Sequence, residues 1–106
     1  MSEVIEKKSG ITFEYDKRVE NKTTIVAHTD DKEPLIISAI LARKNDTTWW
    51  ICITDITHGK LILDAVCYRG RSFVEKLALE AIRGCFSRLG KRRRLMANKQ
   101  KKAEVK

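Results

Sequence analysis

Apolar and polar residues alternate along the first part of the chain in a pattern typical of β-strands. Over Ile11–Asp16 the alternation is strict, so one face of this segment can be buried. A polar turn at residues 17–22 and the β-branched run Thr23–Val26 complete a first hairpin. Residues 1–10 are polar and end in Ser9-Gly10, and we interpret them as a loose lead-in to the first strand.

Three further strands are predicted in the middle of the chain, and all three are rich in apolar residues. Leu35–Arg43 follows a proline and fits either a helix or a buried strand, and its β-branched isoleucines favour the strand. Two-residue turns at Asn45-Asp46 and His58-Gly59 then predict strands over Trp49–Asp55 and Lys60–Tyr68.

The clearest element is a helix over residues 73–89. Ser72 and Glu75 have the spacing of a capping box, and Gly90 supplies a C-terminal stop. These signals predict an α+β fold, in which an antiparallel meander of about five strands is packed by one C-terminal helix. We expect a single domain over residues 1–90. The apolar residues that recur at helical spacing are Val74, Leu77, Ala78, Ala81, Ile82, Cys85 and Leu89.

The predicted turns also fix which residues share a face of the sheet. They place Trp50 in the core beneath the helix and Trp49 on the opposite face, because neighbouring strand residues point to opposite sides. This second face is too apolar to be left in water. The sheet's own curvature, the N-terminal hairpin, a second copy of the chain or a ligand must cover it, and self-association is the favoured interpretation. The alternative is a stacking platform for unpaired bases, formed by Trp49 and Tyr68. The interface or stacking candidates on this face are Trp49, Ile51, Val66 and Tyr68.

Charge is distributed very unevenly along the chain. The formal net charge is +8, but residues 1–68 carry nine Lys and Arg against eleven Asp and Glu. Residues 91–106 carry eight Lys and Arg against one glutamate. A nearly neutral body followed by a dense basic segment favours a polyanionic partner, and we expect residues 91–106 to be a disordered tail. The candidate phosphate-contacting residues are Arg69, Arg71, Arg83, Arg88, Lys91, Arg92, Arg93, Arg94, Lys99, Lys101 and Lys102.

Candidate chemistry is sparse. Three cysteines, with no closely spaced pair, favour a reducing intracellular compartment (cytoplasm, nucleoid or nucleus) over a disulfide framework or a structural zinc site. No phosphate-binding loop, nucleophile elbow, metalloprotease or dinucleotide motif occurs, so neither an enzyme, a metal nor a cofactor is expected. No apolar run is long enough for a membrane span, and no secretory signal is expected.

Two function classes fit these observations. The first is a small non-enzymatic nucleic-acid-binding accessory protein, whose helix end and basic tail contact the phosphates of DNA or RNA. The alternative is a protein-binding module that docks through its apolar sheet face. Such a module would be an inhibitor or modulator of a host nucleic-acid enzyme or defence complex, of the kind that viruses and mobile elements encode.

Overall fold

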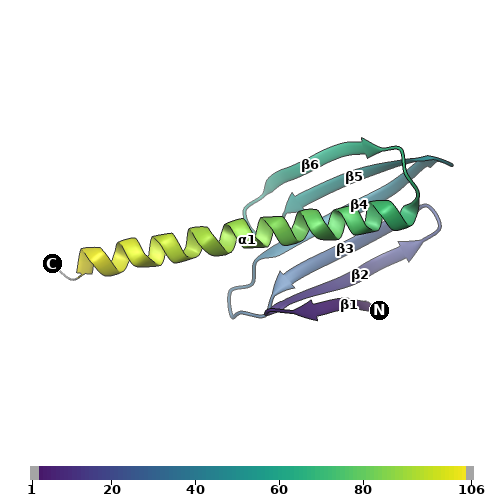
Figure 1. The fold of residues 1–106 in the computed structure, drawn as a ribbon. Coiled ribbons are helices and arrows are strands. Elements are labelled where there is room, and N and C mark those ends of the chain that lie inside the picture. The colour runs from purple at the N-terminus through teal and green to yellow at the C-terminus, as the bar shows by residue number, and fades with distance from the viewer. Residues whose placement is uncertain (1–2, 105–106) are drawn as a thin grey trace.

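A computed structural model gives the fold, with the backbone described for residues 3–104 and the side chains for residues 3–89. Six antiparallel strands form one sheet in chain order, and one helix lies across one face (Figure 1). The predicted fold class is confirmed, with one strand more than expected. The elements are β1 (Glu3–Lys8), β2 (Ile11–Val19), β3 (Lys22–Thr29), β4 (Ile36–Asn45), β5 (Thr48–Asp55), β6 (Lys60–Cys67) and α1 (Arg71–Glu104).

The additional strand is β1, where the sequence predicted a loose lead-in. It pairs with β2 through a two-residue turn at Ser9 and Gly10. Both turn residues have a positive φ, 57° and 76°, which is the geometry that joins tightly paired antiparallel strands. The Ser-Gly dipeptide was therefore the signal for a hairpin. The ambiguous segment from residue 35 is a strand, as expected, since β4 begins at Ile36.

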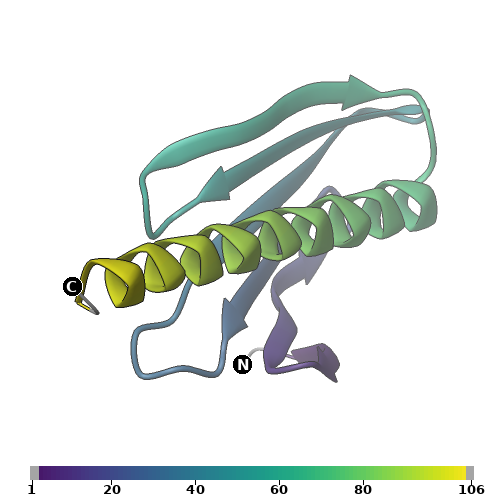
Figure 2. The ribbon, with the colours of Figure 1, turned by 60° about the vertical axis from the view of Figure 1, so that its left-hand side comes forward.

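The core lies between α1 and the sheet face that it covers. Val74, Ala78 and Ile82 are completely buried, and their spacing places them in one stripe along the helix. Ile25, Ala27, Ile37, Ala39, Leu41 and Ile53 supply completely buried side chains from the sheet. Phe13 of β2 meets Phe86 of α1 edge to face, with ring centres 6.4 Å apart. The sheet curls around the helix from both sides (Figure 2).

The two faces of β5 are exchanged relative to the sequence prediction. The turn between β4 and β5 is Asp46-Thr47, and Lys44 forms a one-residue bulge between the pairs Arg43–Trp49 and Asn45–Thr48. An extra residue in one strand shifts the pairing by one position, which moves every side chain of the partner strand to the other face. Trp49 is thus under the helix, only 4% exposed, and Trp50 lies on the open face.

A second irregularity restores the expected faces of β6 from Leu63 onwards, whereas Leu61, expected on the helix side, lies on the open face. The loop between β5 and β6 is longer than the predicted two-residue turn, and the register shifts again between Ile53 and Thr54. Consequently Leu63, Ala65 and Cys67 face the helix side, as predicted, whereas Val66 lies beside Trp50 on the open face.

The start of α1 is held by a different contact from the predicted capping box. The helix already begins at Arg71, and the amide of Val74 donates to the carbonyl of Gly70 at 3.1 Å. Glu75, which is buried, instead accepts two hydrogen bonds from Arg18 of β2, each at 3.1 Å. A bidentate pair of this kind is stronger than a neutral hydrogen bond and ties the first turn of the helix to the sheet.

The same pair perturbs Tyr15 of β2. Burial raises the pKa of the Tyr15 phenol above its ordinary value of 10.0, and the charge of Glu75 raises it further. The Arg18 guanidinium lies 5.0 Å from the centre of the Tyr15 ring. A hydrogen bond to Glu75, together with its negative charge, raises the pKa of Arg18. Tyr15, Arg18 and Glu75 therefore form one electrostatic cluster between β2 and α1.

The helix also extends well beyond the predicted stop. Its backbone passes Gly90 without interruption and reaches Glu104, so the backbone of residues 91–104 is helical where a disordered tail was expected. The described part of the chain measures 62 × 27 × 20 Å, because the second half of α1 projects past the sheet (Figure 1). Val105 and Lys106 lie outside the described residues.

We expect Trp49→Ala to lower the free energy of unfolding by about 3–5 kcal/mol, the loss typical of a large buried aromatic residue. Trp50→Ala removes a half-buried ring and one hydrogen bond, and should cost about 1 kcal/mol. Urea unfolding followed by circular dichroism measures both. Equal losses, or a larger loss for Trp50→Ala, would contradict the register of β5.

We expect the domain to lose stability above about pH 10, because the raised pKa of Tyr15 means that the folded state holds this proton more tightly than the unfolded state does. The contribution of Tyr15 is fully present below pH 10 and is lost as the pH rises through the folded-state pKa. Tyr15→Phe should flatten this decline in unfolding experiments between about pH 9 and 11. An unchanged decline in Tyr15→Phe would show that Tyr15 is not the responsible group.

Candidate nucleic-acid interface

The candidate basic residues lie in three groups along α1, with Arg83 and Arg88 between the two ends. Arg69 and Arg71 are at its beginning, whereas the densely basic segment starts at Lys91. The axial rise of a helix puts Arg71 and Lys91 about 30 Å apart. A single compact phosphate site therefore does not include both end groups. The side chains of Lys91, Arg92, Arg93, Arg94, Lys99, Lys101 and Lys102 lie outside the described part of the structure.

Arg71 is engaged within the protein. Its guanidinium donates to the backbone carbonyls of Val19 and Glu20, the second at 2.6 Å, and lies 5.2 Å from the centre of the Trp49 ring. These contacts fasten the turn between β2 and β3 to the start of α1. Arg71 therefore stabilises the contact between the β2–β3 turn and α1, and it is not free to bind a phosphate. Its Nε is buried and has no hydrogen-bond partner.

The other three candidate arginines with described side chains are also in contact with neighbours. Arg69 lies 5.1 Å from the ring centre of Phe73, and Arg83 forms an ion pair with Glu6 of β1. Arg88 donates to the sulfur of Cys85 at 3.4 Å. Arg69, Arg83 and Arg88 remain exposed, so their charges still contribute to the surface potential.

The predicted aromatic platform does not form as expected. Trp49 and Ile51 are buried in the core, and only Val66 and Tyr68 of the four predicted residues are exposed. The interface proposed from the sequence is thus wrong for its two β5 members. Trp50 takes the place of Trp49 on the open face, where its indole N–H donates to a carboxylate oxygen of Asp64 at 2.5 Å. The sequence left either tryptophan possible at this place, and the bulge at Lys44 determines which of the two lies on the open face.

An apolar groove of about 550 Å³ runs between β6 and the first turns of α1. We call it the β6 groove. Leu63, Ala65 and Cys67 line it from the strand, and Phe73 and Leu77 line it from the helix. Sequence analysis missed this feature, because it depends on how α1 lies relative to the outermost strand.

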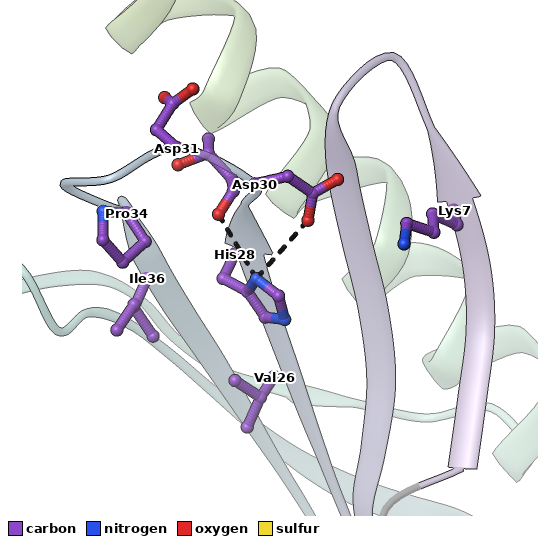
Figure 3. A pocket seen from close by; sticks show the side chains of 8 residues that line it. Lys7, Val26, His28, Asp30, Asp31, Pro34 and Ile36 are labelled. Carbon is purple, nitrogen blue, oxygen red and sulfur yellow. Dashed lines mark hydrogen bonds and ion pairs between the residues drawn. The ribbon is translucent and has the colours of Figure 1, made fainter.

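A second hollow lies at the opposite end of the open face, around His28 of β3 (Figure 3). His28 Nδ1 is 3.3 Å from the carbonyl oxygen of Thr29 and 3.9 Å from a carboxylate oxygen of Asp30. His28 Nε2 is 3.7 Å from Glu14, and Thr12 donates to Asp30 at 3.0 Å. These polar groups satisfy one another, which is the pattern of a structural network at the strand ends.

Over residues 3–89, no three His, Cys, Asp or Glu side chains gather as metal ligands. Asp55 and Asp64 lie on opposite faces of the sheet. Asp55 is buried and accepts from the backbone N–H of His58 at 3.1 Å. Within the described part of the chain, α1 is long, yet it lacks an apolar stretch that could cross a membrane.

Comparisons with known proteins give no relative. No protein-family model matches the chain, and neither a curated protein nor a solved structure does.

We expect Arg71→Ala to lower the free energy of unfolding by about 1–3 kcal/mol, because two carbonyl groups lose a charged donor. Any nucleic-acid affinity should keep its salt dependence, since Arg71 is not free to contact phosphates. Denaturant unfolding and oligonucleotide titrations at several salt concentrations test the two halves of this prediction. A stable variant with a reduced salt slope would instead make Arg71 a phosphate ligand.

Proposed function

We propose that the protein is a non-enzymatic nucleic-acid-binding accessory protein, whose phosphate contacts come from the distal half of α1. One observation carries the proposal: α1 continues past the sheet as a helix over residues 91–104, of which seven of fourteen are Lys or Arg. The body supplies a rigid base for this segment, because the first half of α1 is packed into the core.

The distal half of α1 cannot neutralise its own charge. The sequence contains no Asp or Glu between Glu80 and Glu104, so the basic residues from Lys91 to Lys99 lack acidic neighbours three or four positions away along the helix. Like charges at that spacing destabilise a helix, and phosphate groups would relieve the repulsion. Binding to a polyanion is therefore expected to stabilise this part of the helix.

The arrangement of the charge suits a groove better than a flat surface. Lys91–Arg94 are four consecutive residues, and each step along an α-helix turns by about 100° around its axis. Cations placed at all sides of a helix can reach phosphates on both walls of a nucleic-acid groove. The remainder of the chain is nearly neutral, so binding should be localised at this end.

We expect replacement of Lys91, Arg92, Arg93 and Arg94 by Gln to weaken binding to oligonucleotides and to reduce the slope of log K against log salt by about 3 units on duplex DNA. Glutamine preserves the helix propensity of the segment. Fluorescence anisotropy with labelled single- and double-stranded probes, at several salt concentrations, measures the slope.

The matched control replaces four body lysines, Lys7, Lys8, Lys17 and Lys22, by Gln. It removes the same formal charge from β1–β3, and should leave most of the slope in place. If both quadruple variants lose the same slope, the distal half of α1 is not the binding element. If the parent protein binds neither probe, the proposed function is wrong.

A second candidate function, docking to a partner protein, is favoured by the open face of the sheet. Val26, Ile36 and Ile40 are only half-buried there, and no element of the described chain packs over them. Tyr68 at the end of this face is 76% exposed. Tight binding to a protein partner that survives the glutamine substitutions in the distal half of α1 would support this function over the first.

A further inference from the structure

The two edges of the sheet are protected very differently. In β1, four of six residues are charged, which is a common way to prevent an edge strand from pairing with another chain. In β6, only Lys60 and Asp64 are charged, and the strand contains neither proline nor glycine. β6 ends the strand order of the described sheet, so its outer backbone N–H and C=O groups have no strand partner there.

Exposed apolar side chains concentrate beside this unprotected edge. The described part of the chain has eight large hydrophobic residues with high exposure, and five of them lie on β6, directly after it or on the first turns of α1. They flank the β6 groove and continue onto the open face. Clusters of this kind on a soluble protein mark interaction sites. The five are Leu61, Val66, Tyr68, Phe73 and Leu77.

We propose that β6 pairs in antiparallel fashion with β6 of a second copy of this chain, so that two sheets become one continuous sheet across a two-fold axis. The proposal does not depend on nucleic-acid binding. Each β6 edge has backbone N–H and C=O groups without a strand partner and apolar side chains beside them. Two such edges can form backbone hydrogen bonds with each other and bury each other's apolar side chains. A typical interface buries about 800 Å² per partner, close to a tenth of the 7546 Å² that this chain exposes.

Charge permits this pairing, and the charged side chains of β1 disfavour pairing at the other edge of the sheet. Residues 1–90 are nearly neutral, with fourteen Lys and Arg against thirteen Asp and Glu, so two bodies do not repel each other strongly. The strand β1 would instead bring Glu3, Glu6, Lys7 and Lys8 into a paired edge. One of its carboxylates, Glu6, is already held by Arg83.

Charge also excludes one register of the pair, and we place the two-fold axis at Ala65, where no like charges are opposed. Residues directly opposite each other in an antiparallel pair have side chains on the same face of the sheet. When two identical strands pair about a two-fold axis, one residue at the axis must therefore lie opposite the same residue of the second copy. An axis at Asp64 would oppose two carboxylates and is unfavourable. An axis at Ala65 places Asp64 opposite Val66 of the second copy, and Leu63 opposite Cys67 of the second copy. All helix-side neighbours are then apolar.

Oppositely charged substitutions at Val66 test both the pairing and the register. Sedimentation equilibrium of the full chain should show a dimer. Val66→Asp places a carboxylate opposite Asp64 of the second copy, twice per dimer, and should raise the dissociation constant by about tenfold or more. Val66→Lys meets the same carboxylate with opposite charge and should keep the dimer. Val66 is 41% exposed, so both variants should fold.

The matched control is Val4→Asp on the β1 edge, where Val4 is 57% exposed. It should leave the dimer unchanged. A parent protein that stays monomeric at high concentration overturns the proposal. So does equal dissociation by Val4→Asp and Val66→Asp, or a Val66→Asp variant that remains as tight a dimer as the parent.

A covalent cross-link checks the axis directly. In the proposed register, Ala65→Cys places two thiols opposite each other across the two-fold axis, and mild oxidation should convert most of the protein to a disulfide-linked dimer. The native Cys67 faces Leu63 of the second copy and should cross-link far less in the parent protein. Absence of a covalent dimer in Ala65→Cys, where the parent protein sediments as a dimer, would overturn the β6 register.

Discussion

The structure depends on the burial of one apolar stripe of α1 against one face of the sheet. Val74, Ala78 and Ile82 pack onto buried residues of the central strands, and removing this area from water is the largest favourable contribution to folding. The ion pair between Arg18 and Glu75 and the Arg71 contacts to the β2–β3 turn fix where the stripe begins. This arrangement leaves the other face and both edges of the sheet uncovered by the helix, because a single helix covers only one side of a six-stranded sheet.

Three surfaces remain once the core is formed, and they differ in chemistry. The distal half of α1 is dense in positive charge, the open face of the sheet is half-buried and apolar, and the β6 edge offers an unpaired backbone beside an apolar groove. The charged surface attracts polyanions over a distance that depends on salt. The other two act only at contact, through area removed from water and through backbone hydrogen bonds. The two proposed binding modes, to a polyanion and to a protein surface, therefore use separate parts of the molecule.

The positions of the arginines show why counting charges along a sequence overestimates the number of residues that are available to bind a ligand. Arg71 and Arg83 fell within the basic C-terminal third, yet one holds the β2–β3 turn and the other pairs with Glu6. Their partners are more than fifty positions away in the sequence, so only the folded chain reveals that these charges are used internally. The segment from Lys91 differs, since no acidic residue precedes Glu104 within it. Its excess charge is a property of the local sequence.

The sequence alone determined the class of the fold. Alternation with a period of two identified β2, and apolar or β-branched runs bounded by turns identified β3 to β6. The spacing of the apolar residues in 74–89 identified the packed half of α1. It did not determine which face of β5 meets the helix, because both faces of that strand are apolar and a one-residue bulge at Lys44 decides between them. Tertiary structure thereby placed Trp49 in the core and Trp50 on the surface. It also decided that the helix passes Gly90 and that β6 is left as an open edge beside a groove. A glycine only weakens a helix, and an edge exists only once the strand order is known.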